Sequence, residues 1–287
     1  MFKYILYYLK NFLILIRINK PTGIMLLMFP AIWSILIVLK DEINIYLLLL
    51  FAYGSFIMRS AGCIINDIID KKIDRNIERT KSRPLASEKL ENSDAIILLI
   101  IFLSIGLSIL LSLNSICILL GFIAFPLILI YPLMKRFTYF PQLFLAIVFN
   151  FSVLISWTAA KGGFDIQSLL LYLACIFWTL GYDTIYAYQD INDDKKIGVK
   201  SLAMYLEKNI KFWVASFYLI FISFFSFLAI LNSINSIFFI IIVLFTLKIF
   251  SEIFKSKKLK SRNCLKIFQM NSWYAFFITI GLLFNYI

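Results

Sequence analysis

Nine long apolar stretches constrain this chain more than any other feature of its sequence. Each approaches the ~20 mainly apolar residues that a helix needs to cross a bilayer. Hydrophobic residues make up 62% of the chain and charged residues only 15%, which excludes an ordinary soluble domain. The sequence therefore predicts a polytopic membrane protein of nine spanning helices, with residues 1–287 forming one domain. We place the spans at about 22–39, 45–66, 94–113, 115–133, 139–160, 166–189, 212–231, 235–254 and 266–286.

The first 20 residues have a different character from these stretches. Lys3, Lys10, Arg17 and Lys20 interrupt their apolar residues, and such alternation is typical of an amphipathic helix that lies in the membrane interface. No small-residue cleavage site follows, so we expect this helix to remain in the mature protein instead of acting as a signal peptide.

The basic residues gather on one side of the predicted membrane. With nine spans, the segments 1–21, 67–93, 134–138, 190–211 and 255–266 share a side, and they hold 24 of the 28 Lys and Arg residues. Cytoplasmic loops carry such an excess, so we expect this side to face the cytoplasm, in a bacterial inner membrane or the equivalent mitochondrial one. The net charge of +12 then reflects topology, and no nucleic-acid or obligate protein partner is indicated.

The residue types available for chemistry are few. Histidine is absent, and the four cysteines, Cys63, Cys117, Cys175 and Cys264, are isolated without any CxxC spacing. Zinc sites, disulfide frameworks and histidine-activated nucleophiles are therefore not supported. Asp, Glu, Lys, Arg and Tyr remain as candidates.

Two acidic clusters follow apolar stretches on the predicted cytoplasmic side. In the first, Asp67, Asp70 and Asp74 belong to NDIIDKKIDR, and at about 100° per residue all three face one way around a helix. The second lies within GYDTIYAYQDINDDKKIG (residues 181–198), where Asp183, Asp190 and Asp194 are spaced 7 and 4 residues apart. At the same rotation per residue, we expect these three to share a face of the sixth span as well.

Acidic stripes beside hydrocarbon are costly unless a cation neutralises them. Oxygen ligands without His or Cys suit Mg²⁺, which commonly bridges carboxylates to substrate phosphates. Two such clusters would hold a diphosphate between them. The alternative is that these are ordinary solvated loop acids balanced by neighbouring lysines.

Basic side chains near the clusters would meet the anion. Arg59 lies inside the second span, on nearly the same helix face as Asn66 and Asp70, and an intramembrane arginine indicates a functional site. It also has a structural interpretation, as a snorkelling or ion-paired residue. Lys135 and Arg136 end the fourth span on the cytoplasmic side, where positive-inside topology alone would explain them.

Four segments that together extend over most of the chain carry a recognisable pattern: RINKPTGIMLLMFPAIW (17–33), MRSAGCIINDIIDKKIDRNIERTKSRPLAS (58–87), YPLMKRFTYFPQ (131–142) and YDTIYAYQDINDDKKIGVKS (182–201). In this order they resemble the UbiA family of intramembrane aromatic prenyltransferases. The NDxxDxxxD and RTxxRP elements are shared with haem O synthases and other members. The YDTxYAxxDxxxD element is more selective and is typical of the 4-hydroxybenzoate polyprenyltransferase branch.

The resemblance implies an all-α fold of nine helices around a central cavity, with a lateral opening for a long isoprenoid tail in the lipid. It also implies Mg²⁺-dependent transfer of a polyprenyl group from polyprenyl diphosphate to the carbon ortho to the hydroxyl of 4-hydroxybenzoate, a step towards ubiquinone. By motif position, Mg²⁺ and diphosphate would be held by Asn66, Asp67, Asp70, Asp74, Asp190 and Asp194. Arg136 would meet either the diphosphate or the substrate carboxylate.

The chemistry assigns further roles. Asp183 is the candidate base, because it lies seven residues deeper in its span than Asp190. Tyr131, Tyr182 and Tyr186 would shape the aromatic pocket, although tyrosines also form interfacial belts. One departure is Glu88, which stands where family members commonly have a glycine, and we expect that glycine to serve loop geometry rather than chemistry.

Three other functions fit part of the pattern. A prenyltransferase of the haem O, menaquinone or chlorophyll branch would share the first acidic motif. A polyprenyl-phosphate sugar transferase would also use Mg²⁺ and membrane carboxylates, but its characteristic motifs are not evident. A cation-coupled transporter would instead carry charges near the bilayer midplane or helices broken by Gly and Pro.

Overall fold

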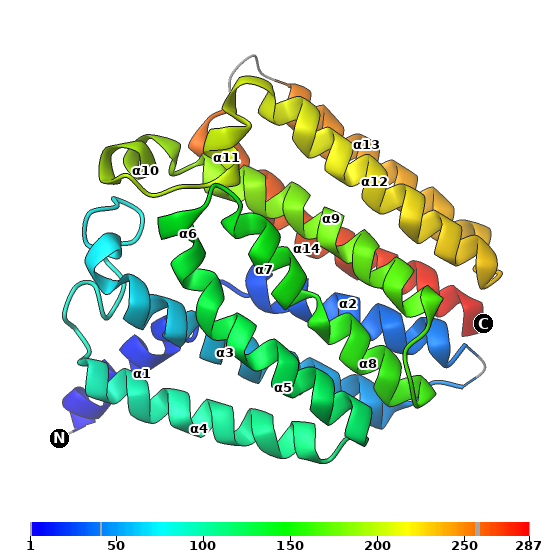
Figure 1. Ribbon diagram of the computed structural model, residues 1–287, viewed down its shortest axis with the longest axis horizontal. Coiled ribbons are helices and arrows are strands. Elements are labelled where there is room, and N and C mark those ends of the chain that lie inside the picture. The colour runs from blue at the N-terminus through cyan, green and yellow to red at the C-terminus, as the bar shows by residue number, and fades with distance from the viewer. Residues whose placement is uncertain (1, 41, 256–258, 287) are drawn as a thin grey trace.

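The structure, a computed structural model, describes residues 2–40, 42–255 and 259–286, and every regular element within these ranges is helical (Figure 1). The N-terminal half comprises α1 (Phe2–Leu15), α2 (Thr22–Val38), α3 (Ile45–Asp74), α4 (Asn92–Leu111), α5 (Ser115–Ile130), η1 (Tyr131–Leu133) and α6 (Met134–Phe137). It is followed by α7 (Pro141–Phe149), α8 (Phe151–Lys161), α9 (Ile166–Tyr188), α10 (Ile191–Ile197) and α11 (Leu202–Tyr205). The last elements are η2 (Glu207–Asn209), α12 (Ile210–Leu231), α13 (Ser236–Phe254), α14 (Ser261–Leu283) and η3 (Phe284–Tyr286).

The prediction of a helical membrane protein is confirmed, with one difference in the count. In the described part of the chain, eight helical segments are long and apolar enough to cross a membrane. The first predicted span is also an apolar helix, α2, but its 17 residues make it shorter than the others. The predicted interfacial segment contains α1, whose C-terminal end packs beside α3 in a small core that includes Leu15 and Ile64.

Asparagine caps begin several helices at the tight turns. Asn114 accepts a hydrogen bond from the Cys117 amide at 3.0 Å, and Asn235 accepts one from the Phe238 amide at 3.1 Å. Each cap satisfies a backbone donor at a helix N-terminus. Short hairpins therefore join α4 to α5 and α12 to α13.

The helices of the C-terminal half pack with α2 around an aromatic core. Trp33 of α2 lies 5.2 Å from both Trp178 of α9 and Phe225 of α12, measured between ring centroids. The Trp178 indole and the Tyr218 hydroxyl both donate to the Asn271 side chain, at 2.8 and 2.9 Å. Satisfied polar groups of this kind fix helices against one another where no water is available.

The loops that carry the candidate site lie at one end of the bundle. Figure 1 shows the segment after α3, together with α1, α6, α10 and α11, at the same end. The helices α3, α4, α5 and α8 enclose a cavity beneath this end.

Candidate active site

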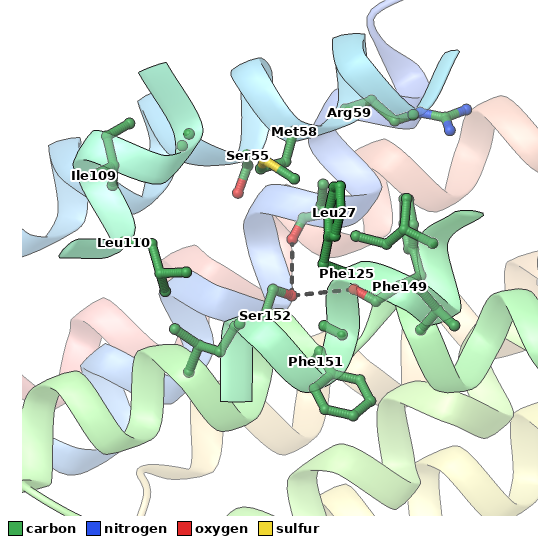
Figure 2. A pocket seen from close by; sticks show the side chains of 18 of the residues that line it. Leu27, Ser55, Met58, Arg59, Ile109, Leu110, Phe125, Phe149, Phe151 and Ser152 are labelled. Atoms are coloured by element: carbon green, nitrogen blue, oxygen red, sulfur yellow. Dashed lines mark hydrogen bonds between the residues drawn. The ribbon is translucent and has the colours of Figure 1, made fainter. Parts of the chain in front are cut away.

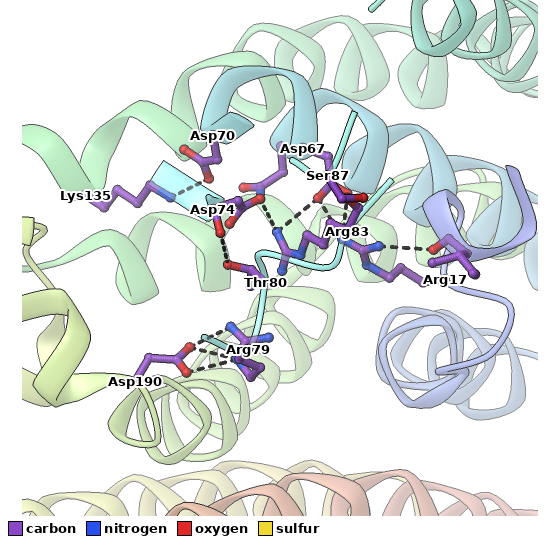
Figure 3. Close-up of polar contacts among 12 residues, drawn as sticks. Arg17, Asp67, Asp70, Asp74, Arg79, Thr80, Arg83, Ser87, Lys135 and Asp190 are labelled. Atoms are coloured by element: carbon purple, nitrogen blue, oxygen red, sulfur yellow. Dashed lines mark hydrogen bonds and ion pairs between the residues drawn. The ribbon is translucent and has the colours of Figure 1, made fainter. Parts of the chain in front are cut away.

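Asp67 lies at the centre of a network of ion pairs at this end of the bundle (Figure 3). It is only 1% exposed, and the Arg17 guanidinium donates to both of its carboxylate oxygens at 2.7 and 2.8 Å. Arg83 also donates to Asp67 at 3.1 Å and to Asp74 at 2.7 Å. One arginine thus joins two acids of α3, which continues as a helix to Asp74 and not only to residue 66.

Asp70 lies between these two acids in sequence, and one of its carboxylate oxygens has no hydrogen-bond partner. The Lys135 ammonium donates to its Oδ2 atom, while its buried Oδ1 atom has no hydrogen-bond partner. A buried carboxylate oxygen without a partner is costly, so it marks a place where a ligand is expected.

The second acidic cluster meets the first through basic side chains. Arg79 donates to both oxygens of Asp190, at 2.6 to 3.0 Å, and to the Tyr186 hydroxyl at 2.9 Å. Arg79 also lies within electrostatic range of Asp74. Lys135 lies within the same range of Asp194, so Arg79 and Lys135 connect the two clusters.

Asp194 is almost fully buried in α10 and its carboxylate makes no hydrogen bond or ion pair with the residues that the structure describes. Burial, and then the charge of Asp190, raise the pKa of Asp194 to about 7. The ionised form of this group is therefore disfavoured unless a cation approaches it.

The predicted common helix face of Asp183, Asp190 and Asp194 is wrong, because the helix is not continuous. The helix α9 ends at Tyr188 and α10 begins only at Ile191. At the break, the Gln189 side chain donates to the Tyr186 carbonyl, and the backbone tightens into i to i−3 hydrogen bonds. Asp190 thereby turns towards Arg79.

In this structure the acidic side chains do not converge on a common metal site. Among the residues that the structure describes, no three Asp, Glu, Cys or His side chains lie close enough together to hold one metal ion. Arginine and lysine groups lie between them instead.

Sequence reasoning predicted Lys135 at this site but missed the three arginines. Arg17, Arg79 and Arg83 were part of the quoted RINKP and RTxxRP elements, yet no role followed from their spacing. Burial, and then the charges of Arg79, Arg17 and Arg83, lower the pKa of Lys20, so four cations face one region. The sequence feature that could have indicated them is the pair Arg79 and Arg83, four residues apart in the loop that follows the acidic helix.

Arg17 reaches the site by an uncommon backbone conformation. Its φ is 62°, in the left-handed region that non-glycine residues seldom adopt. The turn follows α1 and directs the side chain to Asp67. The two charge-assisted hydrogen bonds to a buried carboxylate offset this backbone cost.

The other predicted basic residues differ in their placement. Lys135 contacts the first cluster, whereas Arg136 is exposed and donates to the Ile69 carbonyl of α3 at 3.0 Å. The structure therefore brings Lys135, and not Arg136, against the acids. Asn66 also lies at the site, where its side chain accepts from the Tyr131 hydroxyl at 3.3 Å.

Arg59 stands apart from the ion pairs, at one end of the cavity. The cavity has a volume of about 360 Å³ and mainly aliphatic and aromatic walls. The Arg59 guanidinium lies 5.6 Å from the centre of the Phe149 ring, and its buried Nε atom has no hydrogen-bond partner. Asp183, from α9, is within electrostatic range of Arg59. A desolvated cation with a free donor can bind an anionic substrate group.

Two of the tyrosines predicted to shape the pocket lie near Asp183 in the sequence of α9 and contact the same ring. Tyr182 and Tyr186 pack against Phe268 of α14, with ring centroids 5.9 and 4.3 Å apart. The Tyr182 hydroxyl is paired with the Thr179 hydroxyl at 3.1 Å.

Glu88 adopts the geometry that a glycine would supply. Its φ is 59°, and its side chain pairs with Arg75. The left-handed backbone at this position supports the interpretation that the glycine common in the family serves the loop after α3 and not the chemistry.

Comparison with known proteins identifies the family to which the chain belongs. The model of the UbiA prenyltransferase family matches residues 27–279, which is most of the chain. The chain belongs to this family. The matched range includes every predicted site residue, from Arg59 to Asp194.

Relatives of this UbiA family member have been named for their activity. A mitochondrial 4-hydroxybenzoate polyprenyltransferase of Drosophila pseudoobscura pseudoobscura is 46% identical over 211 residues, which are 72% of this chain and 53% of the relative. The chain thus spans about half the length of this relative. A 4-hydroxybenzoate octaprenyltransferase of Pseudomonas syringae pv. tomato is 35% identical over 277 residues, covering 96% of this chain and 93% of the relative.

Solved UbiA structures share the fold. A UbiA homologue from Aeropyrum pernix K1 superposes with a TM-score of 0.74 at 22% identity, over 92% of this chain and 98% of the homologue. A homologue from Archaeoglobus fulgidus, solved with GPP and Mg²⁺, gives a TM-score of 0.70 at 15% identity, over 95% and 99%.

Proposed function

We propose that this UbiA family member is a Mg²⁺-dependent 4-hydroxybenzoate polyprenyltransferase. It would transfer a polyprenyl group from polyprenyl diphosphate to the ring carbon ortho to the hydroxyl, giving 3-polyprenyl-4-hydroxybenzoate for ubiquinone biosynthesis. The observation that carries the proposal is the interleaved set of buried acids and arginines at the head of an apolar cavity. The names of the relatives, and the GPP and Mg²⁺ bound to the Archaeoglobus homologue, support it.

The acids fit a hard divalent cation. They offer oxygen donors only, and the partnerless Oδ1 atom of Asp70 is available without breaking any contact. Mg²⁺ would be held by residues drawn from Asn66, Asp67, Asp70, Asp74, Asp190 and Asp194. When bound, the ion would neutralise charge that develops on the leaving diphosphate.

Basic side chains of the protein would also neutralise the charge that develops on the leaving diphosphate. Arg79 and Arg83 lie in one loop and Lys135 on α6; Arg79 pairs with Asp190 of the second cluster, while Arg83 and Lys135 pair with acids of the first. Their charges would stabilise the diphosphate as the bond between the allylic carbon and oxygen breaks.

The acceptor would lie against Arg59. Its carboxylate would pair with the free guanidinium donor, and its ring would attack the allylic carbon while the cavity walls exclude water. The new carbon–carbon bond leaves a proton on the ring, and Asp183 would accept it. Asp183 lies on the Arg59 side of α9, deeper than Asp190.

The membrane orientation follows from the same residues. The site lies at the end of the bundle that carries most Lys and Arg residues, which by positive-inside topology is the cytoplasmic or matrix end. A polyprenyl diphosphate would enter with its head at this surface and its tail among lipid or cavity walls.

An acceptor panel tests the branch. Purified protein with Mg²⁺ and a prenyl diphosphate should prenylate 4-hydroxybenzoate and not the aromatic acceptors of the haem O, menaquinone or chlorophyll branches. Transfer to one of those acceptors instead would assign the chain to another branch. Cation flux in liposomes without any prenyl transfer would favour the transporter.

The Arg79→Gln variant should weaken binding of the diphosphate. Losing charge-assisted hydrogen bonds costs about 1.5–3 kcal/mol, so KM for the prenyl diphosphate should rise about 10- to 100-fold. KM for 4-hydroxybenzoate should change far less. Steady-state kinetics, with inorganic diphosphate as competitor, measures both.

Arg75→Gln is the matched control for this variant. Arg75 lies four residues earlier, pairs with the exposed Glu88, and should leave both KM values near those of the parent. A similar rise for both arginines would argue against a specific role for Arg79.

A further inference from the structure

The first turn of α2 contains a glycine, Gly23, at a buried position. Glycine is less favourable than alanine inside a helix, because it loses more backbone freedom when the helix forms. The helical backbone at this residue would accept an alanine. The reason for a glycine here therefore lies in the space around it.

The group that occupies this space is the guanidinium of Arg59. A Cβ atom at residue 23 would lie 2.8 Å from Nε, 2.9 Å from Nη2 and 3.2 Å from Cζ of Arg59, which are the three heavy atoms nearest to it. Ordinary contacts of a Cβ atom begin at 3.4 Å. A methyl group on residue 23 and the guanidinium therefore cannot both keep these positions.

The same three distances show which edge of Arg59 faces α2. Cζ is farther from the added carbon than either nitrogen is, whereas a point above the middle of the flat guanidinium face would have Cζ as its nearest atom. The methyl group of an alanine would therefore lie off the edge formed by Nε and Nη2. That edge presents two parallel N–H donors, the arrangement with which arginine binds a carboxylate through two hydrogen bonds.

This edge includes the atom of Arg59 that lacks a partner. Nε is buried and makes no hydrogen bond with the part of the chain that the structure describes. The Phe149 ring lies 5.6 Å from Cζ and offers no oxygen or nitrogen acceptor. Figure 2 shows Arg59 at one end of the side chains that line the cavity, so an anion in the cavity would meet the guanidinium at that end.

We propose that Gly23 is a positioning residue that selects for an acidic acceptor. Its bare backbone keeps the Nε–Nη2 edge of Arg59 free of side-chain atoms, and the carboxylate of the acceptor pairs with that edge. The inference rests on the proposed function and adds the residue that leaves Arg59 able to bind. With alanine at position 23, either the methyl group covers the edge or Nε moves by at least ~0.6 Å, from 2.8 to 3.4 Å, which is enough to disturb a binding geometry.

The test measures KM for 4-hydroxybenzoate and for a prenyl diphosphate, with purified protein and Mg²⁺. Gly23→Ala should raise KM for 4-hydroxybenzoate at least ~10-fold, because a misplacement of about 1 Å can cost about 10²-fold. The value of kcat, and KM for the prenyl diphosphate, should change far less, since a substitution that removes only binding of one substrate leaves kcat unaltered.

Two further variants separate this role from a general effect on the fold. Gly62→Ala adds the same methyl group to a glycine of α3 that also lines the cavity, but nothing lies within 4 Å of it, so both KM values should match the parent. Arg59→Lys replaces the donor pair by a single ammonium group without such an edge. Adding Gly23→Ala to Arg59→Lys should then change KM for 4-hydroxybenzoate less than about twofold, because the two sites act on one interaction.

An unchanged KM for 4-hydroxybenzoate in Gly23→Ala, or an equal rise in Gly62→Ala or on the Arg59→Lys background, would overturn the inference. A rise confined to KM for the prenyl diphosphate would also overturn it, because the edge would then bind the donor. Loss of kcat without a change in either KM would show a purely structural role for Gly23. A parent protein that transfers no prenyl group to 4-hydroxybenzoate would instead contradict the proposed function, so the two failures are distinguishable.

Discussion

The Asp70→Asn variant should lose prenyl transfer almost completely, with kcat falling about 10²- to 10³-fold, the loss seen when one preorganised electrostatic group is removed. The amide keeps the shape of the side chain and can still accept from Lys135, but it removes the charge that a divalent cation requires. Asp70 Oδ1 is a buried acid oxygen without a hydrogen-bond partner, so the variant removes a charge that is available to a cation. Rates at saturating donor and acceptor, over a range of Mg²⁺ concentrations, measure the effect.

Asp193→Asn is the matched control for this loss. Asp193 belongs to the second acidic run but is partly exposed, and its only ion pair within the described ranges is a 3.8 Å contact with Lys196. Its variant should retain near-normal kcat. If Asp70→Asn kept more than about a tenth of the parent rate, or if both variants fell alike, the carboxylate site would be assigned wrongly.

The Arg59→Leu variant should separate binding of the acceptor from chemistry on the ring. Removing one partner of a buried charge pair costs about 2–5 kcal/mol, so KM for 4-hydroxybenzoate should rise at least ~30-fold. The leucine retains an apolar wall beside Phe149. An acceptor that lacks the carboxylate, such as phenol, should be used equally well, or equally poorly, by parent and variant.

The prediction is therefore tested by comparing the parent and the variants with both acceptors, 4-hydroxybenzoate and phenol. Arg75→Leu serves as the control, because Arg75 is exposed and is not one of the residues that line the cavity. An equal loss with phenol and with 4-hydroxybenzoate would show that Arg59 supports the fold or the diphosphate, and not the carboxylate.

The fold was predictable because lipid permits few solutions. Each apolar stretch had to be a helix, whereas the caps at Asn114 and Asn235 became evident only from the structure. The helix α2 matches its predicted range to within one residue but is short, with 17 residues, whereas α3 continues beyond its predicted end at residue 66 to Asp74.

The arrangement of the first acidic cluster was also predictable, because it lies on a single helix. The helix α3 runs unbroken through Asp67, Asp70 and Asp74, so the phase calculated at 100° per residue applies to all three. The same calculation failed for Asp190 and Asp194, because a local hydrogen bond of Gln189 ends α9 before them.

The arginines could not be placed from sequence, because they act through tertiary contacts. Arg17 and Asp67 are 50 residues apart, and Arg79 and Asp190 are 111 apart. Periodicity describes a single helix, whereas these pairs depend on how a loop and two helix ends meet. Arg59 could be predicted as a site residue from sequence alone, because a charged residue inside an apolar span is itself an indication of function.

The most direct measurement of the central claim is the mass of the product. Purified protein is incubated with 4-hydroxybenzoate and a polyprenyl diphosphate, with Mg²⁺ in one sample and excess chelator in the other. We predict a 3-polyprenyl-4-hydroxybenzoate, with the new bond at the carbon ortho to the hydroxyl, only in the sample with Mg²⁺. No prenylated 4-hydroxybenzoate in either sample, or equal amounts in both, would contradict the account.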